Sequence, residues 1–328
     1  MNLNIQQTGG ALQQSTLDAL NSLAAGVFPT QGNAYYVNPR TGVDVNPGTV
    51  QLPFRSLRQA LSVCTAGQND VVFLCASSNT SSLTTDYLSA NLDWNKDLTH
   101  LIGLNAGGAI GQRSRISNLS TAAAMAPMLT VSANGCLIQN IAVFQGNPAS
   151  GTTSIAMQVS GERNHIVNCA ISGCGGATAD VAGSRSLKVS GSENTFDGCY
   201  IGLDTIIRGT MTEEVEISAG ARNVFRSCHF ESYTSLSTFK AITVATGCDR
   251  FIRFENCMFT AVQNITSAVA ATGALGITTM NGQVIMMNPY VYGYSQIVTA
   301  DNAYVQVLGL NGLATGHLVG IAQGVDAT

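Results

Sequence analysis

The chain has 328 residues, a formal net charge of −4 and only 10% charged residues, whereas glycine occurs 34 times. Because lysine and arginine are not clustered, the composition excludes a nucleic-acid-binding surface, and without a run of 18 apolar residues it predicts no membrane-spanning helix. We therefore expect an uncharged surface of Ser, Thr, Asn and Gln, which steers partners weakly over long distances.

The first ten residues contain neither the basic nor the apolar region of a classical signal peptide. Together with nine cysteines, this predicts folding in a reducing compartment. No Cys-x-x-Cys metal-binding pair is present, since even Cys169 and Cys174 have four residues between them. The cysteines are interpreted as small buried hydrophobic residues, and no cofactor is predicted.

Residues 1–33 are predicted to form an N-terminal arm with one short helix. A capping box begins at Ser15, and the apolar face that follows consists of Leu17, Leu20 and Leu23. A helix of about two turns is unstable alone, so it needs a surface to lie on. That surface is either the end of its own domain or another subunit.

Residues 34–76 contain four segments in a recognisable order. A strand at 35–38 is followed by a Gly/Asn/Pro loop at 42–49, an amphipathic helix from Ser56 to Cys64 and a core strand at 69–75. This order resembles the entry to the right-handed parallel β-helices of the pectin-lyase-like superfamily. The resemblance extends by coil pattern over most of 70–310. It implies an all-β, right-handed parallel β-helix (a solenoid) with a short N-terminal capping helix and an N-terminal arm.

A column of cysteines recurs at intervals of 29 or 30 residues, which is the period of a solenoid. Its members are Cys169, Cys199, Cys228 and Cys257, with Asn140 assigned as their predecessor. An apolar column runs three residues ahead and is predicted to contain Leu137, Ile166, Phe196, Phe225 and Phe254. Equivalent positions of a β-helix stack about 4.8 Å apart, so both columns are predicted to be ladders in the core.

Two polar columns accompany the apolar ones. Asparagine recurs at Asn164, Asn194 and Asn223. Charges of alternating sign recur at Asp197, Arg226 and Glu255, which predicts an outward salt-bridge ladder worth less than about 1 kcal/mol per pair.

The domain organisation follows from these patterns. We predict an arm at 1–33, a parallel β-helix at 34–310 and a C-terminal tail at 311–328, with irregular coils and long insertions between 77 and 127.

Residues able to catalyse polysaccharide cleavage are few. A glycosidase needs two carboxyls about 5–9.5 Å apart. Asp204 and Glu231 follow the cysteine column on neighbouring coils and form a possible pair, although solvated loop charges are the preferred interpretation.

The same solvated interpretation covers the acidic cluster downstream of Arg208, which consists of Glu213, Glu214 and Glu216. The four histidines are interpreted as isolated polar residues, because they form neither a metal site nor a Ser-His-Asp set: His100, His165, His229 and His317. No metal site and no catalytic residue are therefore predicted.

Three tyrosines near the C-terminal end form a possible subunit or glycan contact: Tyr290, Tyr292 and Tyr294. Alternate tyrosines on a strand pack at a sheet edge or at a subunit contact more often than they bind glycans.

The superfamily that the chain resembles includes polysaccharide lyases, glycoside hydrolases and virion proteins without enzymatic activity, so the fold does not determine the function. We predict that the chain is a structural, non-enzymatic virion protein of a bacteriophage, similar to a β-helical capsid decoration or head-associated protein. It is expected to be a homotrimer that binds the major capsid or other virion proteins, to assemble in the host cytoplasm and to be located in the virion. A host-surface glycan is a possible further partner.

Two alternatives are a tailspike-like polysaccharide depolymerase, either a lyase or a glycoside hydrolase, and a bacterial surface adhesion β-helix.

Overall fold

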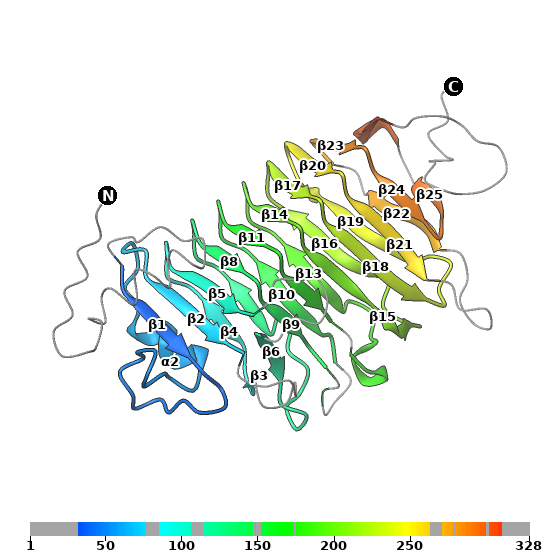
Figure 1. Ribbon diagram of the computed structural model, residues 1–328. Helices are drawn as coiled ribbons and strands as arrows, with labels where there is room; N and C mark the ends of the chain where they lie inside the picture. The colour runs from blue at the N-terminus through cyan, green and yellow to red at the C-terminus, as the bar shows by residue number, and fades with distance from the viewer. Residues whose placement is uncertain are drawn as a thin grey trace.

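The computed structural model describes residues 32–76, 85–105, 114–146, 148, 152–173, 175–262, 271–277, 280–299 and 302–309. Within them the chain winds into an elongated solenoid made of three sheets (Figure 1). The predicted arm helix with Leu17, Leu20 and Leu23, and the predicted tail at 311–328, lie outside the described residues. The proposed division into arm, solenoid and tail therefore stays a prediction.

Each sheet is named here by its strands, given in spatial order. Sheet A contains β1 (Ala34–Val37), β2 (Val71–Cys75), β5 (His100–Leu104), β8 (Leu137–Gln139), β11 (His165–Val167), β14 (Thr195–Asp197), β17 (Asn223–Arg226), β20 (Phe251–Glu255), β23 (Gln283–Met287) and β26 (Val305–Leu308). Sheet B contains β3 (Thr85–Leu88), β6 (Arg115–Asn118), β9 (Ala142–Phe144), β12 (Ala170–Ser172), β15 (Tyr200–Arg208), β18 (His229–Thr234), β21 (Met258–Val262) and β24 (Tyr290–Tyr292). Sheet C contains β4 (Leu92–Trp94), β7 (Leu129–Val131), β10 (Ile155–Val159), β13 (Arg185–Val189), β16 (Glu213–Ala219), β19 (Lys240–Gly247), β22 (Ala271–Ile277) and β25 (Tyr294–Val298).

All paired strands are parallel, and the chain passes from sheet A to sheet B to sheet C before it returns to sheet A one coil further on. Within the described residues, the helical elements are α2 (Leu57–Val63) and the 3-10 turns η2 (Ala177–Ala179) and η3 (Asn302–Tyr304). The predicted all-β, right-handed parallel β-helix is confirmed.

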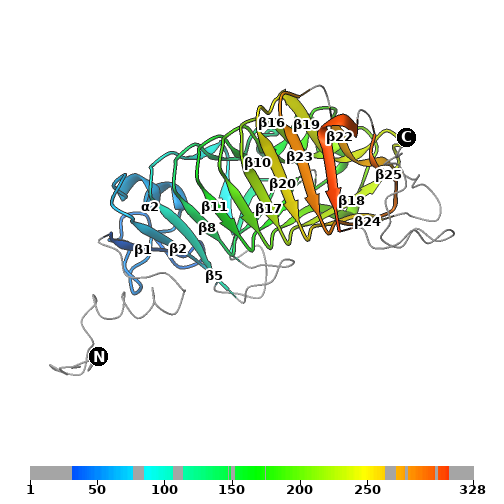
Figure 2. The ribbon, with the colours of Figure 1, turned by 90° about the horizontal axis from the view of Figure 1, so that it is seen from above.

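Helix α2 covers the N-terminal end of the solenoid, beside β1 and β2 (Figure 2). Its N-cap is Ser56, whose side chain accepts a hydrogen bond from the backbone N–H of Gln59 at 3.2 Å. The face that turns inward buries Leu57, Ala60 and Leu61. The helix therefore shields apolar side chains and sheet ends that would otherwise meet water.

The core consists of stacked ladders along the solenoid axis. The rings of Phe196 and Phe225 stack with centroids 4.6 Å apart, and those of Phe225 and Phe254 with centroids 5.0 Å apart. A second aromatic ladder on sheet B joins Phe230 and Phe259, with centroids 4.9 Å apart. Stacking of this kind adds about 0.5–1.5 kcal/mol per pair beyond the area that the rings bury.

The first members of the cysteine column and of the apolar column were each assigned one residue too early. Strand pairing places Ile138, not Leu137, below Ile166 and Phe196. By the same register Asn140 is stacked on Asn168, and their side chains hydrogen-bond at 2.9 Å. The coil between Ile138 and Ile166 is shorter than the coils that follow it. The sequence alone does not show which turn of this coil is the shorter one.

The corner between sheets A and B explains why Asn140 is not part of the cysteine column. Six described residues at this corner have positive φ angles, and they are Asn140, Asn168, Gly198, Ser227, Asn256 and Asn288. Asparagine and glycine tolerate this left-handed conformation best. The asparagine recurrence at this corner therefore reflects backbone geometry.

All eight cysteines within the described residues are unpaired. Cys169, Cys199, Cys228 and Cys257 are each 1% exposed, as predicted for a core ladder. Burial raises the pKa of the Cys136 and Cys248 thiols to about 11, so few thiolates form at neutral pH.

We expect nine free thiols when the denatured chain is titrated with a thiol reagent. In the native state the buried thiols should react slowly, because the reagent attacks thiolate and the sulfur atoms are not accessible. A denatured count below nine would mean that the chain contains a cross-link.

The column of Asn164, Asn194 and Asn223 forms a buried polar ladder inside the turn between sheets C and A. The side-chain oxygen of Asn194 accepts a hydrogen bond from the backbone N–H of Asn164 at 2.9 Å, and its side-chain amide donates to the carbonyl of Gly161 at 3.0 Å. Asn223 repeats both bonds one coil further on. Each asparagine thereby satisfies two backbone groups that water cannot reach.

We expect Asn194→Ala to lower the free energy of unfolding by about 2–4 kcal/mol, because two buried backbone groups lose their partners. Urea denaturation followed by circular dichroism measures this loss. Asn288→Gly provides the control, since Asn288 lies on the outside of the corner, where its side-chain amide donates to Asn256 in an exposed bond, and glycine keeps its positive φ angle.

The predicted outward salt-bridge ladder is confirmed. Arg226 contacts Asp197 at 3.4 Å and Glu255 at 2.9 Å, with its own side chain 44% exposed. Exposure to solvent weakens such pairs.

Candidate functional site

The outer face of sheet B contains a cluster of polar side chains over strands β15, β18 and β21. Phe230 and Phe259 point into the core, so their neighbours in the sequence point outward. Strand register aligns the outward residues of neighbouring strands in two rows across the sheet, and we call each row a file. One consists of Tyr200, His229, Met258 and Tyr290, and the other of Gly202, Glu231, Thr260 and Tyr292.

Glu231 is the centre of this cluster, which we call the Glu231 cluster and which also includes His229 and Thr260. The Glu231 carboxylate oxygen Oε2 accepts a hydrogen bond from the Thr260 hydroxyl at 2.5 Å and lies 2.9 Å from His229 Nε2. The Glu231 side chain is only 8% exposed, whereas that of His229 is 30% exposed. The other carboxylate oxygen, Oε1, is buried and has no hydrogen-bond partner among the described residues.

The hydrogen bonds around Thr260 assign the protons of the cluster. The single hydroxyl proton of Thr260 is donated to Glu231, so the 2.6 Å contact between Thr260 Oγ1 and His229 Nε2 requires a proton on that nitrogen. In a neutral imidazole the other nitrogen, Nδ1, is then the proton acceptor. His229 and Thr260 hold one oxygen of Glu231 and leave the other free.

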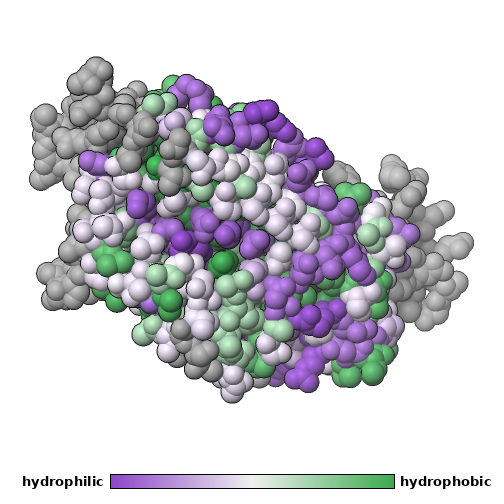
Figure 3. All heavy atoms as spheres, turned by 180° about the vertical axis from the view of Figure 1, so that it is seen from behind, coloured by the Kyte–Doolittle hydropathy of each residue, from purple (hydrophilic) through white to green (hydrophobic). Residues whose placement is uncertain are grey.

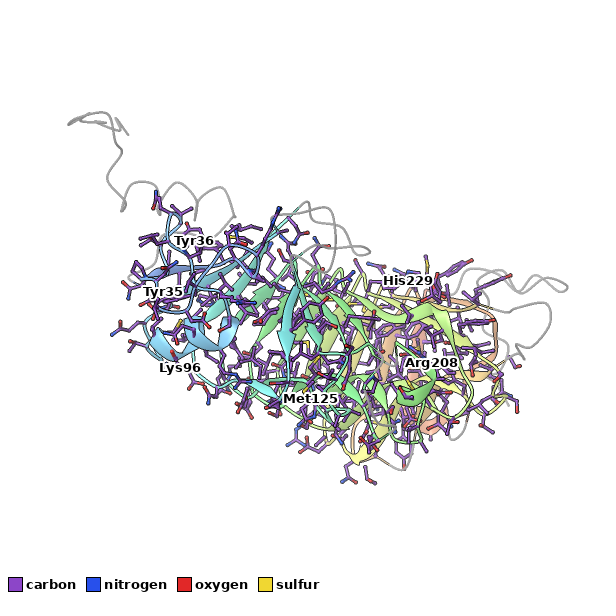
Figure 4. The ribbon with its side chains drawn as sticks, turned by 90° about the horizontal axis from the view of Figure 1, so that it is seen from below. Tyr35, Tyr36, Lys96, Met125, Arg208 and His229 are labelled. Carbon is purple, nitrogen blue, oxygen red and sulfur yellow. The ribbon has the colours of Figure 1, made fainter. Side chains whose placement is uncertain are left out.

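His229 was predicted to be an isolated polar residue, and this prediction is wrong. Its ring contacts Tyr200 edge-on with centroids 4.9 Å apart and contacts Glu231 and Thr260 through Nε2. Figure 4 shows His229 near the margin of the solenoid, with Arg208 further toward its middle. Its contact with Glu231 joins residues two positions apart on one strand, which strand alternation could have suggested, whereas its contacts with Tyr200 and Thr260 join residues 29 and 31 positions apart, which no local motif reveals.

Two carboxylates lie near the Tyr200 phenol. Burial raises the pKa of Tyr200, and the negative charges of Glu231 and Asp204 raise it further, with Glu214 as a smaller cause. The charges of both members of the sequence-predicted pair therefore reach the same phenol.

Asp204 occupies the start of an irregularity in β15. The register of β15 with β18 is regular up to the pair of Leu203 and Ser232, and it resumes only at the pair of Arg208 and Thr234. Residues 204–207 thus stand opposite the single residue Tyr233 and form a bulge. Asp204 is exposed at the beginning of this bulge. Bulges of this kind redirect side chains and are frequent beside active sites.

Gly202 stands opposite Glu231 on β15 and admits no larger residue. It has φ +108°, and a Cβ atom there would lie 1.9 Å from the Glu231 carbonyl oxygen and 3.4 Å from the Glu214 carboxyl carbon. The close approach brings β15 against the Glu231 backbone. The Glu214 carboxyl group lies on the same side of Gly202, so Gly202 alone separates it from the Glu231 backbone.

Behind this layer lies a fully buried ion pair between Arg208 and Glu214. Arg208 Nε donates to Glu214 Oε1 at 2.8 Å, and both side chains are 0% exposed. Ser186 donates its hydroxyl to the other Glu214 oxygen at 2.5 Å. Arg208 Nη2 donates to the carbonyl of Gly173 at 2.9 Å. Every oxygen of this buried carboxylate is therefore paired.

The interpretation of the acidic residues on β16 as solvated loop charges is wrong. Glu213 pairs with Arg185, and Glu214 pairs with Arg208, all four with low exposure. Glu216 lies 3.1 Å from Lys188, with its side chain 23% exposed. Alternation with the buried Val215 and Ile217 could have shown that these glutamates belong to a strand and not to a loop, but it places Glu214 on the outward face and does not reveal its burial.

The three tyrosines predicted as one contact surface are divided by the structure. Tyr290 and Tyr292 lie outward on β24 and are 37% and 50% exposed. Tyr294 begins β25, is 4% exposed and donates a hydrogen bond to Ser232 at 3.1 Å. A turn at Gly293, with φ +81°, interrupts the alternation of the strand. Tyr294 is therefore buried at the corner between sheets B and C and is not part of the exposed tyrosine surface.

A separate cavity of about 610 Å³ lies between the ends of β20 and β23 and is lined by Arg222, Arg250, Phe251 and Tyr304 among others. It contains no member of the Glu231 cluster. On the back of the molecule, hydrophilic and hydrophobic residues are interspersed (Figure 3).

Among the described residues, no group of three or more His, Cys, Asp and Glu side chains could hold a metal ion. Nor does the described part of the chain include a helix of the length and apolarity needed to cross a membrane.

No protein-family model matches the sequence, and neither does any curated protein. Solved structures do resemble the fold. A rhamnogalacturonan lyase aligns with a TM-score of 0.59 at 16% identity, covering 84% of this chain and 73% of that one. A pectate lyase aligns with a TM-score of 0.57 at 15% identity, covering 89% and 79%. A pectin methylesterase in complex with a hexasaccharide aligns with a TM-score of 0.51 at 16% identity, covering 80% and 79%.

These neighbours overturn the prediction that the chain is not an enzyme. All three are, by name, enzymes of pectic polysaccharides, so this fold gives no support to a chain without enzymatic activity. The error came from the weight given to the missing carboxylate pair, since the sequence shows neither the burial of Glu231 nor its contact with His229. The similarity is one of architecture: the chain has the pectin-lyase-like right-handed parallel β-helix fold.

Proposed function

We propose that this protein cleaves a polysaccharide on the outer face of sheet B, with Glu231 and Asp204 as the reacting carboxyl groups. The observation that carries the proposal is the Glu231 carboxylate: it is 8% exposed, one oxygen is held by His229 and Thr260, and the other has no partner. An unpaired buried carboxylate oxygen is costly for stability, and such costs are concentrated at functional sites.

The pair of carboxyls suits acid and base catalysis. The negative charges of Glu231 and Asp204 both raise the pKa of the Tyr200 phenol. The two residues belong to neighbouring strands, which lie about 4.8 Å apart. That arrangement is compatible with the separation of about 5–9.5 Å that glycosidases use. One carboxyl is exposed and the other is fixed, so the two groups have different environments, as acid and base roles require.

The exposed tyrosines supply a binding surface beside these groups. Tyr292 belongs to the same file as Glu231, with Thr260 between them. Aromatic rings on a strand face offer flat apolar area with a polar edge, which suits sugar rings. A polysaccharide is also the substrate class that the names of the structural neighbours share.

The test is a panel of polysaccharides incubated with the purified chain, with new reducing ends as the readout. Cleavage by the wild type should be lost in Glu231→Gln and in Asp204→Asn. Glu255→Gln is the matched control, because Glu255 lies outward on sheet A and belongs to the salt-bridge ladder. Equal cleavage by all three variants would contradict the assignment.

The virion setting is a second, separate proposal. We infer that the enzyme is carried by a bacteriophage particle as a homotrimer, contacts capsid or other virion proteins and assembles in the host cytoplasm. The supporting observation is an exposed apolar loop between β1 and α2, at which Val43 is 50%, Val45 90% and Leu52 52% exposed. Exposed apolar side chains in one place favour a protein contact. Light scattering tests this, since a monomer without affinity for particles contradicts it.

A further inference from the structure

The cations of this chain are distributed unevenly. Of the 15 lysines and arginines, none follows Arg253 in the sequence. Strands β21 and β24, and every segment after them, therefore contain no positive side chain. Strand β18 contains none either, and the single cation of β15 is Arg208.

Arg208 cannot serve a ligand on the outer face. Its side chain is 0% exposed and its guanidinium is bonded to Glu214 and to the Gly173 carbonyl. The other described cation on sheet B is Arg115 on β6, which lies 5.9 Å from the ring of Phe144. Strand β6 is four strands from β18, or about 19 Å at 4.8 Å per strand.

The remaining cations of the regular coils lie on sheets A and C or in the turns between these two sheets. In those turns Arg163 and Arg222 pair with Glu193, and Arg250 contacts Asp249. Lys240 begins β19 of sheet C, where its ammonium group donates a hydrogen bond to the Thr238 carbonyl. On sheet A, Arg226 and Arg253 pair with Asp197 or Glu255. On sheet C, Arg185 and Lys188 pair with the glutamates of β16. The outer face around the Glu231 cluster thus has two acidic groups, Glu231 and Asp204, and no described cation to balance them.

The absence of a balancing cation on this described face favours uncharged sugars over acidic ones. A polyuronate has a carboxylate on every sugar, and each one placed along the tyrosine file would meet acidic side chains without a cation. A neutral sugar has no such penalty, because its hydroxyls can hydrogen-bond with Thr260 and carboxylate oxygens, and its apolar face can lie on tyrosine.

We propose that the site takes a neutral glycan and cleaves it by hydrolysis, not by β-elimination. The inference rests on the proposed function and narrows its substrate class and reaction. β-Elimination removes a proton from the carbon next to a carboxyl group, and a neutral sugar has no carboxyl group to make that proton acidic. Hydrolysis has no such requirement.

The reaction balances with the two carboxyls alone. One carboxyl gives its proton to the glycosidic oxygen as the bond from that oxygen to the anomeric carbon breaks. The other, as carboxylate, takes a proton from the water that bonds to the anomeric carbon. One water is consumed, and two sugar ends form.

The binding path follows from the register. Glu231, Thr260 and Tyr292 occupy one outward file, so Tyr292 lies about 10 Å from Glu231, or two strand spacings. A glycan that lies along the solenoid axis places one sugar at the carboxyls and another against Tyr292. Tyr292→Ala should weaken oligosaccharide binding about tenfold.

The experiment compares polysaccharides with their own carboxyl-reduced forms, such as polygalacturonate with the galactan made from it by reduction, and adds a panel of neutral glycans. Affinity electrophoresis measures binding, and reducing ends together with ultraviolet absorbance of unsaturated products measure cleavage. We expect neutral glycans to be bound and cut without unsaturated products, and each reduced form to be preferred over its acidic parent.

Two variants sharpen the test. Met258→Lys adds a cation at an exposed position beside His229 and should increase affinity for the acidic forms at least severalfold, whereas Met258→Gln should not. Tyr87→Ala is the control for Tyr292→Ala, because Tyr87 is exposed on β3 at the far end of the same sheet.

The outcomes separate the two proposals. Cleavage of the acidic forms in preference to the neutral ones, lost in Glu231→Gln, would overturn the neutral-glycan inference and keep the proposed function. Failure of the wild type to bind or cut any glycan would overturn both.

Discussion

Replacing Arg208 with methionine is expected to lower the free energy of unfolding by about 3–5 kcal/mol. The substitution leaves the Glu214 carboxylate 0% exposed and without its charge partner, because Ser186 alone cannot replace a guanidinium. Removing one member of a buried ion pair is more costly than removing both, since the remaining charge has neither water nor a counter-ion. Urea denaturation followed by circular dichroism measures the loss.

The double variant Arg208→Met with Glu214→Leu separates charge from packing. It should recover most of the stability lost by Arg208→Met, because no isolated charge remains in the core. Arg226→Met is the control, since its pairs with Asp197 and Glu255 are exposed and should change stability by no more than about 1 kcal/mol. If Arg208→Met and Arg226→Met have equal effects, Arg208 is not a buried ion-pair partner.

Glu231→Gln is expected to lower the rate of glycan cleavage by a factor of about 10²–10⁴, the range that one acid or base group contributes. Glutamine keeps the shape of glutamate and can still accept the Thr260 hydroxyl proton, so the fold should be retained. What it lacks is the ability to take up or release a proton at the oxygen that has no partner in the wild type.

The neighbours of Glu231 should have smaller effects of another kind. Thr260→Val and His229→Gln leave the carboxyl in place but remove a group that orients it, so both are positioning substitutions. We expect losses of roughly tenfold for each, because a carboxyl that is held less firmly spends less time in the reacting geometry. Unchanged melting temperatures in all three variants show that the losses arise at the site. A loss in Thr260→Val equal to that in Glu231→Gln would contradict the central role of the carboxyl.

The recurrence of residues at a period of 29–30 was sufficient to predict the solenoid. One coil of a β-helix has a constant length where its turns are regular, so core positions return at constant intervals in the sequence. For this reason the Phe196 ladder, the cysteine ladder and the Arg226 salt bridges could all be predicted. Each of these depends only on which residues share a file.

The site could be predicted in part. Glu231 and Asp204 were paired because they occupy neighbouring coils, but their environment was assigned as solvent. Glu231 lies opposite Gly202 and beside the strand with the bulge at 204–207, and strand pairing, not composition, defines both features. The identity of a charged residue on a strand does not show whether its side chain faces water or is buried.

What the sequence determined is therefore the period: which side chains form the ladders, and that the chain is a β-helix with a capped N-terminal end. The tertiary structure decided the register and the side-chain contacts in the coils that depart from this period. It shifted the first members of the ladders by one residue, buried Arg208 with Glu214, turned Tyr294 into the corner and brought His229, Glu231 and Thr260 together. These outcomes depend on turn lengths and on contacts across neighbouring coils, such as those of Ser186 with Glu214 and of Glu231 with Thr260, which take effect only when the coils pair.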